Sequence, residues 1–271
     1  MSSLKKIILI TGASSGIGFE TAKGLLNEGH IVYCVARQIQ KMQILEMMTG
    51  AKVLQLDVTN DKSLVELIEV IIEQEGKIDV LINNAGFALF GAVEDVSMND
   101  ARKELEVNLI APARLMQLVI PHMRQGKAGL IINISSLAGK VASPFGGWYN
   151  ASKFALEGLT DTVRNEVGEF NIKVVLIEPG GIKTNVTPIA MENLYQQSGN
   201  TVYADKVKKL AAINRDKYAN PDVVYELISK IIQTNAPRAR YITGYLGKTM
   251  IRLKSILPDK WMDHILRKRL A

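Results

Sequence analysis

Tyr149 and Lys153 are the two side chains whose types and spacing most directly indicate acid–base chemistry in this sequence. They stand four residues apart at the start of a segment with helical spacing that runs to about Phe170, and such residues lie one turn apart on the same helix face. A phenol has a pKa of about 10, and a neighbouring ammonium favours the phenolate and lowers that value. Taken alone, Y-x-x-x-K is more typical of an ordinary pair on a half-exposed helix, so its meaning depends on its surroundings.

Further polar residues stand where apolar runs end. Ser136 follows the run at 129–135, and Asn-Asn-Ala-Gly at 83–86 closes an earlier run. Asn108 lies inside the helical segment after that earlier run, and Pro-Gly-Gly-Ile-Lys-Thr at 179–184 closes a later run. In a parallel sheet, the carboxyl ends of the strands form the ligand crevice. We therefore expect these groups to lie around that crevice together with the Tyr and Lys pair.

A glycine-rich loop follows the first apolar run. It reads Thr-Gly-Ala-Ser-Ser-Gly-Ile-Gly at 11–18 and opens a helical pattern. Backbone without Cβ atoms approaches a pyrophosphate closely, and the amides of a helix N-terminus supply donors and a partial positive charge. The spacing differs from the common dinucleotide fingerprint, so a tight turn without a ligand is the alternative. The candidate cofactor contacts in this loop are Gly12, Ser14, Ser15, Gly16, Ile17 and Gly18.

The end of the second apolar run favours NADP(H) over NAD(H). About 20 residues past the glycines, a dinucleotide-binding fold normally places an Asp or Glu on the ribose 2′-hydroxyl. Here that place holds Arg37, and no acidic residue occurs between Gly29 and Met42. A guanidinium pairs with a 2′-phosphate, which a carboxylate would repel, and the Ser14 hydroxyl is a second candidate contact. The alternative for Arg37 is a solvated cation at a strand end.

Short apolar runs alternate with longer helical patterns as far as about residue 243. Continuous apolar runs indicate strands covered on both faces, and their alternation with helices predicts an α/β fold with a doubly wound parallel sheet. Asn60, or Thr59 beside it, and the pair Ser97 and Asp100 are candidate helix caps. The predicted strands span residues 5–11, 31–36, 52–57, 78–83, 129–135, 172–178 and 239–243.

Composition excludes several classes of protein. The 271 residues carry 33 Lys plus Arg against 27 Asp plus Glu, a formal net charge of +6, with 47% apolar residues. This mixture is ordinary for a globular protein. Cys34 is the single cysteine, and no Cys or His cluster offers a metal site. No run approaches the ~18 apolar residues that cross a bilayer. We expect a cytoplasmic protein without a metal or a disulfide framework.

The conjunction of these motifs resembles the short-chain dehydrogenase/reductase family. T-G-x-x-x-G-x-G, N-N-A-G, Asn108, Ser136, Y-x-x-x-K and P-G-x-x-x-T occur in the family's order over about residues 5–245. The resemblance implies a Rossmann-like, three-layer αβα fold, hydride transfer with a nicotinamide cofactor, no metal, and a homodimer or homotetramer. The chain is similar to NADP-preferring members of the hydroxysteroid and retinol types.

The resemblance also implies a role for each matching residue. Tyr149 is similar to the general acid–base, and Ser136 to the hydroxyl that holds the substrate oxygen. Lys153 resembles the residue that binds the nicotinamide ribose and lowers the tyrosine pKa. Asn108 resembles the residue that holds a water molecule of the proton relay. The implied cofactor contacts outside the glycine loop are Arg37, Asp57, Val58, Asn84, Ala85, Gly86, Tyr149, Lys153, Pro179, Gly180, Ile182 and Thr184.

Two segments depart from the regular alternation. Residues 184–220 are longer than an ordinary connection, and a lid over the site and a surface excursion explain them equally well. Residues 244–271 carry seven Lys and Arg against two Asp, a local charge of +5 that leaves +1 for the rest of the chain. Pro258 should divide them into two amphipathic helices. We expect a catalytic domain at 1–243 and a basic helical extension at 244–271.

The basic extension leaves several partners open. Basic amphipathic helices that contain Trp can lie on anionic membrane surfaces. The same apolar stripes can dock on the domain, cover the substrate pocket or pack against a second subunit, and we favour these interpretations over peripheral membrane contact. Nucleic acid is disfavoured because the rest of the chain offers no matching basic face.

The sequence thus predicts an NADP(H)-dependent oxidoreductase that transfers a hydride between the nicotinamide and a ketone, an aldehyde or a secondary alcohol. The extension resembles that of members acting on steroid-, retinoid- or lipid-like compounds, which implies a small apolar substrate. The alternative is a protein that senses NADP(H) or binds a membrane surface without turnover. A sensor needs only the phosphate loop, so an intact set of Ser136, Tyr149 and Lys153 argues against it.

Overall fold

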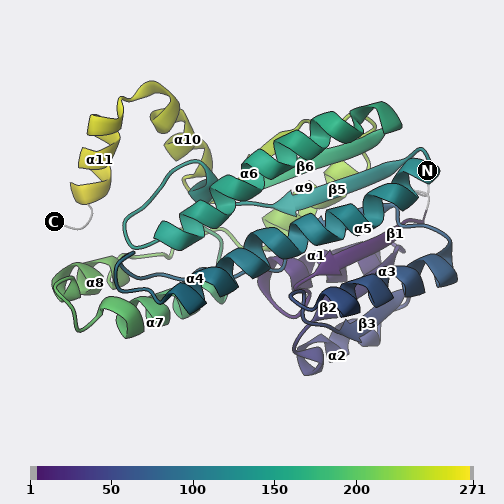
Figure 1. Cartoon of the computed structure of the whole chain (residues 1–271), viewed down its shortest axis with the longest axis horizontal. Helices are drawn as coiled ribbons and strands as arrows, with labels where there is room; N and C mark the ends of the chain where they lie inside the picture. Colours follow the sequence, from purple (N-terminus) through teal and green to yellow (C-terminus); the bar gives the residue numbers. More distant parts are fainter. Residues whose placement is uncertain (1–4, 269–271) are drawn as a thin grey trace.

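The computed structural model describes residues 5–268, and the seven strands in this range form one parallel sheet in the order β3-β2-β1-β4-β5-β6-β7 (Figure 1). This order runs outward in both directions from β1, so the predicted doubly wound parallel sheet is confirmed. The strand ends lie within two residues of the predicted runs. The strands are β1 (Ile7–Thr11), β2 (Ile31–Ala36), β3 (Ala51–Gln55), β4 (Val80–Asn83), β5 (Gly129–Ile134), β6 (Ile172–Pro179) and β7 (Arg240–Thr243).

Helices cover both faces of the sheet and give three layers (Figure 1). Successive side chains of β1 point into different cores, Ile7 and Leu9 into one, Ile8 and Ile10 into the other. Both faces of the strands therefore need apolar residues, which explains the continuous runs in the sequence. The first core is covered by α3 (Asp61–Glu75), α5 (Ala111–Gln125) and α6 (Gly147–Val167), and the second by α1 (Gly16–Asn27), α2 (Gln43–Glu46) and α9 (Asp222–Ile232).

Two helices begin at side-chain caps that the sequence predicts. The Asn60 side chain accepts the backbone N–H of Ser63 at 3.1 Å before α3. Ser97 Oγ accepts the N–H of Asp100 at 3.1 Å and donates to its carboxylate at 2.8 Å before α4 (Met98–Leu105). Each cap satisfies an amide that the helix itself leaves unpaired.

The crevice of this sheet opens where the ends of β1 and β4 diverge toward different connections. Thr11 Oγ1, the last side chain of β1, accepts the N–H groups of Asn84 at 3.0 Å and Ala85 at 2.9 Å. The Asn84 amide in turn donates to the Thr11 carbonyl at 2.9 Å and to the Gly12 carbonyl at 3.3 Å. The glycine loop and the Asn-Asn-Ala-Gly segment are thereby fixed to each other.

The long segment between β6 and β7 consists mainly of α7 (Val186–Ser198), α8 (Ala204–Ala211) and α9. α7 and α8 pack on the body through a buried cluster that includes Ala92 and Phe145. Ser198 Oγ also accepts the N–H of Ala92 at 2.8 Å. The segment therefore covers the region next to the start of α6, which favours the interpretation as a lid over that of a surface excursion.

The extension forms two helices, α10 (Gly247–Ile256) and α11 (Asp259–Lys268), which Pro258 separates as predicted. They lie at the same end of the molecule as α7 and α8 (Figure 1). Met250 and Met262 are buried against Val141 of the body, so the apolar stripes dock on the rest of the chain. Arg269, the last cation of the extension, lies outside the described residues. Within residues 5–268, no helix has the length and apolar character to cross a membrane.

Two neighbouring residues of α11 test this docking. Met262 is 2% exposed, whereas Trp261 is 64% exposed. Met262→Ala should remove a buried contact worth about 2 kcal/mol and lower the hydrogen-exchange protection of α10 and α11 about 30-fold. Trp261→Ala should leave that protection unchanged. An equal loss of protection in both variants would contradict the docking.

Candidate active site

α6 carries Tyr149 and Lys153 one turn apart in its first turns, as their spacing predicts. Lys153 is 6% exposed, and its Nζ donates a hydrogen bond of 2.9 Å to the Ile134 carbonyl at the end of β5. The same Nζ lies 5.9 Å from the centroid of the Tyr149 ring. The half-buried phenol and the buried amine therefore lie side by side at the carboxyl end of the sheet.

Ser136 lies where β5 ends and the short 3-10 helix η3 (Leu137–Gly139) begins. Its Oγ accepts the N–H of Ala138 at 3.1 Å and so caps that helix. The Ser136 side chain also reaches the Tyr149 phenol, and this hydrogen-bonding contact lowers the pKa of the phenol. The structure thus brings together the three residues Ser136, Tyr149 and Lys153.

Burial dominates the protonation of this pair. It raises the pKa of Tyr149, the contact with Ser136 lowers it, and the Glu104 carboxylate adds to the rise, so that the net shift is upward. Burial also lowers the pKa of Lys153 to about 8, although the carboxylate charges of Glu104 and Glu157 raise that pKa. The predicted lowering of the Tyr149 pKa is therefore wrong for this structure, because the loss of hydration outweighs the favourable contacts of the phenolate.

Asn108 lies in a π-helical turn, η2 (Glu106–Ile110), that joins α4 to α5. Its Oδ1 accepts the N–H of Phe87 at 3.1 Å, and its Nδ2 donates to the Phe87 carbonyl at 2.9 Å and to Ser152 Oγ at 3.1 Å. A Cβ on Gly86 would lie 3.0 Å from Asn108 Oδ1 and 3.8 Å from Lys153 Nζ. Asn108 and Lys153 therefore border the same glycine, and the π-helical turn is of a kind often found at functional sites.

The glycine loop forms a bare cradle between β1 and α1. Gly12 and Gly16 have φ values of +70° and +55°, which other residues rarely adopt. A Cβ on Gly18 would lie 2.3 Å from the Gly12 carbonyl oxygen. Ser15 is the N-cap of α1 without a side-chain cap bond, and the first turn has no acidic residue. The amides and the positive end of α1 are therefore suited to a pyrophosphate.

The end of β6 meets this cradle. The Thr184 methyl lies 3.1 Å from the position of a Cβ on Gly16. Pro179 ends the strand, and Gly180 donates its N–H to the Thr243 carbonyl at 2.8 Å. A cavity of about 430 Å³ opens beside them and is lined by Ile182, Lys183, Thr184, Asn185, Thr187, Pro188, Met191, Arg215 and Tyr218. The structure thus places the predicted contacts from β6 next to those of the glycine loop.

Arg37 and Asp57 lie at the adjacent ends of β2 and β3. The Arg37 side chain is exposed, and Val58 is buried. Burial alone would raise the pKa of Asp57, but hydrogen bonds from the Thr59 N–H and hydroxyl, and then the charge of Arg37, hold it below its ordinary value. The arginine is therefore close enough to the Asp57 carboxylate to act on it.

Sequence reasoning missed buried polar residues that hold the site. Asn150 donates to the carbonyls of Ala138 at 2.8 Å and Val141 at 3.2 Å, which fastens the segment after Ser136 to α6. Asn133, a polar residue within an apolar strand run, donates to Thr160 Oγ1 at 2.8 Å. Asn133 could have been predicted as a structural residue, because it is a polar residue inside an apolar run.

Glu104 is a further buried group that sequence reasoning missed. It is fully buried on α4, one turn before Asn108, and its Oε1 accepts the N–H of Leu89 at 2.8 Å. Its Oε2 is buried without a hydrogen-bond partner among the described residues. Burial raises the pKa of Glu104 to about 7, while the Leu89 N–H and the Lys153 charge lower it.

Comparison with known proteins assigns the family. A model of the short chain dehydrogenase family matches residues 6–194. The chain is 38% identical over 267 residues to the 3-ketodihydrosphingosine reductase of Bacteroides thetaiotaomicron, with 97% of each protein covered. This chain belongs to the short-chain dehydrogenase family. Another relative is human retinol dehydrogenase 8, 30% identical over 94% of this chain and 87% of the relative.

Solved structures agree with this assignment. This chain resembles the crystal structure of a short-chain dehydrogenase from Streptomyces avermitilis, with a TM-score of 0.78 and 26% identity. The match covers 98% of this chain and 99% of that one. It also resembles a metagenomic short-chain oxidoreductase in complex with NADP, with a TM-score of 0.71 and 26% identity, over 90% and 98% of the chains. A third neighbour is 4-hydroxyisoleucine dehydrogenase complexed with NADH, with a TM-score of 0.72 and 28% identity, over 88% and 96%.

These comparisons confirm the predicted family, the Rossmann-like fold class and the assignment as an oxidoreductase. They also support a nicotinamide cofactor, since related structures hold either NADP or NADH.

The raised pKa of Glu104 gives this short-chain dehydrogenase a pH-dependent stability. The folded chain holds the proton up to about pH 7, while the unfolded carboxyl releases it near its ordinary value of 4.5. Stability should therefore fall as the pH rises from about 5 to 7, by on the order of 3 kcal/mol. Glu104→Gln should make this fall smaller by the Glu104 contribution in urea unfolding at several pH values, while the contribution of Glu178, whose pKa is also raised to about 7, should stay. A variant with the same slope as the wild type would refute the assignment.

Proposed function

We propose that this short-chain dehydrogenase is an NADP(H)-dependent oxidoreductase that interconverts an apolar ketone or aldehyde and the corresponding alcohol. The observation that carries the proposal is the contact of Ser136 with Tyr149 beside the buried Lys153. A hydroxyl and a phenol that meet in a crevice bind one carbonyl oxygen together and supply its proton.

The residues around the crevice fit a nicotinamide dinucleotide. The backbone of the glycine loop and the N-terminus of α1 are assigned to the pyrophosphate, and Gly18 lets that loop fold closely, since a Cβ there would meet the Gly12 carbonyl. Asp57 and Val58 are assigned to the adenine side, and Ile182, Thr184 and Lys153 to the nicotinamide side. When bound, the nicotinamide supplies or accepts the hydride. The remaining assigned contacts are Asn84, Ala85, Gly86, Tyr149, Pro179 and Gly180.

The chain's own residues handle the proton. The raised pKa of Tyr149 keeps the phenol protonated at neutral pH, which is the form that donates to a developing alkoxide. The Ser136 hydroxyl holds that oxygen by a hydrogen bond. Lys153, with a pKa near 8, exchanges protons close to neutral pH. Because Lys153 and Asn108 border Gly86 together, we assign the proton path from Tyr149 past Lys153 toward Asn108.

The preference for NADP(H) rests on charge at the end of β2. Arg37 stands where NAD-dependent proteins carry an acid, and its side chain is exposed beside the place assigned to the adenine ribose. An exposed guanidinium there attracts a 2′-phosphate.

An apolar substrate is supported by the walls of the site. The Phe90 ring lies 6.3 Å from the Tyr149 ring, centroid to centroid. Phe145 packs in the apolar cluster that joins α7 and α8 to the body. Leu137 packs against the docked extension. The names of the relatives, a ketodihydrosphingosine reductase and a retinol dehydrogenase, both refer to lipid-like compounds.

The domain boundary after residue 243 belongs to the same proposal, with residues 1–243 as the catalytic domain and 244–271 as an extension that walls the substrate site. A sensor or membrane-binding protein without turnover is not favoured, because such a protein has no use for the Ser136 and Tyr149 contact. The homodimer or homotetramer, the cytoplasmic location, the absence of a metal and of nucleic acid, and a peripheral membrane contact stay predictions from the sequence.

Replacing Tyr149 by Phe tests the proposed chemistry. The variant keeps the ring and loses the proton, so reduction of all-trans-retinal or 3-ketodihydrosphingosine by NADPH should slow by at least about 100-fold. NADPH affinity, measured by fluorescence titration, should fall much less than turnover, because the variant keeps the ring and loses only the hydroxyl. Tyr195→Phe, an exposed tyrosine on α7, serves as the control and should keep full activity. Near wild-type turnover of the Tyr149 variant would remove the phenol from the mechanism.

Replacing Arg37 by Ala tests the cofactor preference. Loss of a charge-assisted pair costs about 1.5–3 kcal/mol, so the KM for NADPH should rise about 10- to 100-fold while the KM for NADH stays unchanged. Lys41→Ala removes another exposed cation four residues later and should affect neither cofactor. The preference would be disproved by equal changes for NADPH and NADH in the Arg37 variant.

A further inference from the structure

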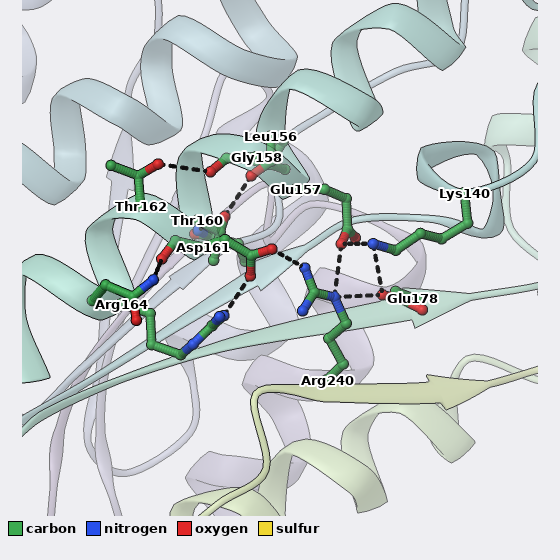
Figure 2. Close-up of polar contacts among 12 residues, drawn as sticks. Lys140, Leu156, Glu157, Gly158, Thr160, Asp161, Thr162, Arg164, Glu178 and Arg240 are labelled. Atoms are coloured by element: carbon green, nitrogen blue, oxygen red, sulfur yellow. Dashed lines mark hydrogen bonds and ion pairs between the residues drawn. The ribbon is translucent and has the colours of Figure 1, made fainter.

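Two cations and two carboxylates from four different segments meet in one place (Figure 2). Lys140 follows η3, Glu157 lies on α6, Glu178 on β6 and Arg240 on β7. The two carboxylates are almost completely buried, with side chains 5% and 2% exposed, whereas the two cations reach in from the rim with 29% and 30% exposure. We call these four residues the charge cluster.

The charge cluster is a network of ion pairs, which Arg240 extends to Asp161 and, through it, to Arg164. Lys140 Nζ lies 2.8 Å from Glu157 Oε2 and 3.9 Å from Glu178 Oε1. Arg240 Nε lies 3.1 Å and 3.3 Å from the same two oxygens. Burial and then the Glu157 charge raise the pKa of Glu178 to about 7, while the two cations lower it. Two buried carboxylates that share the same two cations are costly when a cation is removed, since a buried charge is then left unpaired.

The charge cluster lies directly against the residues proposed for catalysis. Lys140 is the fourth residue after Ser136, and Glu157 is one helical turn after Lys153. A Cβ on Gly139 would lie 3.1 Å from Glu157 Cγ and 3.1 Å from the Lys153 carbonyl oxygen. The segment between Ser136 and Lys140 therefore rests on the turn of α6 that carries Lys153.

The same segment is fastened to α6 at a second point. Asn150, the residue after Tyr149, donates to the carbonyls of Ala138 and Val141, and its Oδ1 accepts the N–H of Ser143 at 3.1 Å. Asn150 thus holds the segment at the first turn of α6, and the pair of Lys140 with Glu157 holds it two turns further along. Two attachments fix both the position and the direction of the segment.

We propose that Lys140 is a positioning residue of the active site, which holds the Ser136 hydroxyl at the Tyr149 phenol by pairing with Glu157 and Glu178. The inference rests on the proposed roles of Ser136 and Tyr149. We assign Lys140 no contact with the substrate or the cofactor, and it acts through the segment that begins at Ser136. A displacement of about 1 Å in such a group lowers turnover on the order of 100-fold.

A double-mutant cycle on the full chain tests the inference. Proteins labelled with [ζ-13C]tyrosine report the hydrogen bonding of Tyr149 at pH 7, and Tyr149→Phe assigns its resonance. Ser136→Ala and Lys140→Met should each move the Tyr149 resonance, and Lys140→Arg should restore it. In the Ser136→Ala background, Lys140→Met should move it no further, because the contact is already lost. Turnover of all-trans-retinal or 3-ketodihydrosphingosine should follow the same pattern, with a 10- to 100-fold loss for Lys140→Met.

Controls separate positioning from general destabilisation. Lys173→Met removes a lysine from the opposite end of β6 and should leave the resonance in place. If Lys140→Met does not fold, the double variant Lys140→Met with Glu157→Gln takes its place in the cycle. It removes both charges of the pair, so that neither partner is left unpaired.

Two outcomes would overturn the inference. One is an unchanged Tyr149 resonance in Lys140→Met, and the other is an equal shift from Lys140→Met with and without Ser136. An unchanged resonance and unchanged turnover in Ser136→Ala would instead refute the proposed function itself.

Discussion

The burial of a polar helix face is the constraint on which the rest of this structure depends. α6 turns toward the sheet a row of residues that can hydrogen-bond or carry charge, and each of them loses water on folding. Their partners come from the end of β5, from β7, from η2 and from the segment after Ser136. A face of this kind tolerates one arrangement of its surroundings, because any shift leaves a buried group unpaired. The buried polar residues of α6 are Asn150, Ser152, Lys153, Glu157 and Thr160.

The segment from Ser136 to Ser143 has an unusual position between two parts of the chain. α6 holds it from within by Asn150 and Glu157. The extension holds it from outside, since Leu137 and Val141 contact Met250 and Met262. The proposed catalytic hydroxyl therefore stands on a short stretch that the domain and the extension confine together. The apolar stripes of the extension are therefore packed within one chain. The cations of the extension can face water while these stripes are docked.

Much of the fold follows from the sequence, because burial on both faces of a parallel sheet leaves a simple record of continuous apolar runs closed by Gly, Asn or Pro. The spacing of Tyr149 and Lys153, the glycine loop and the caps at Asn60 and Ser97 are equally local and are found where predicted. What escaped prediction depends on contacts between distant segments. Lys140 and Arg240 are 100 residues apart and look like ordinary surface cations until the sheet brings them to the same two carboxylates. The direction of the Tyr149 pKa failed for the same reason, since the sequence shows a neighbouring amine but not the depth of burial.

That depth of burial gives the site its proton balance. Burial raises the pKa of the phenol and lowers that of the amine, so it moves both Tyr149 and Lys153 toward their uncharged forms. Glu104 opposes this for Lys153 and reinforces it for Tyr149, and its own pKa of about 7 places it between protonated and ionised at neutral pH. Three titratable groups in one region of the site thus act on one another's protonation. A proton that leaves the phenol can be replaced from a neighbour without forming an isolated buried charge, which is the property that a repeated proton transfer at this site requires.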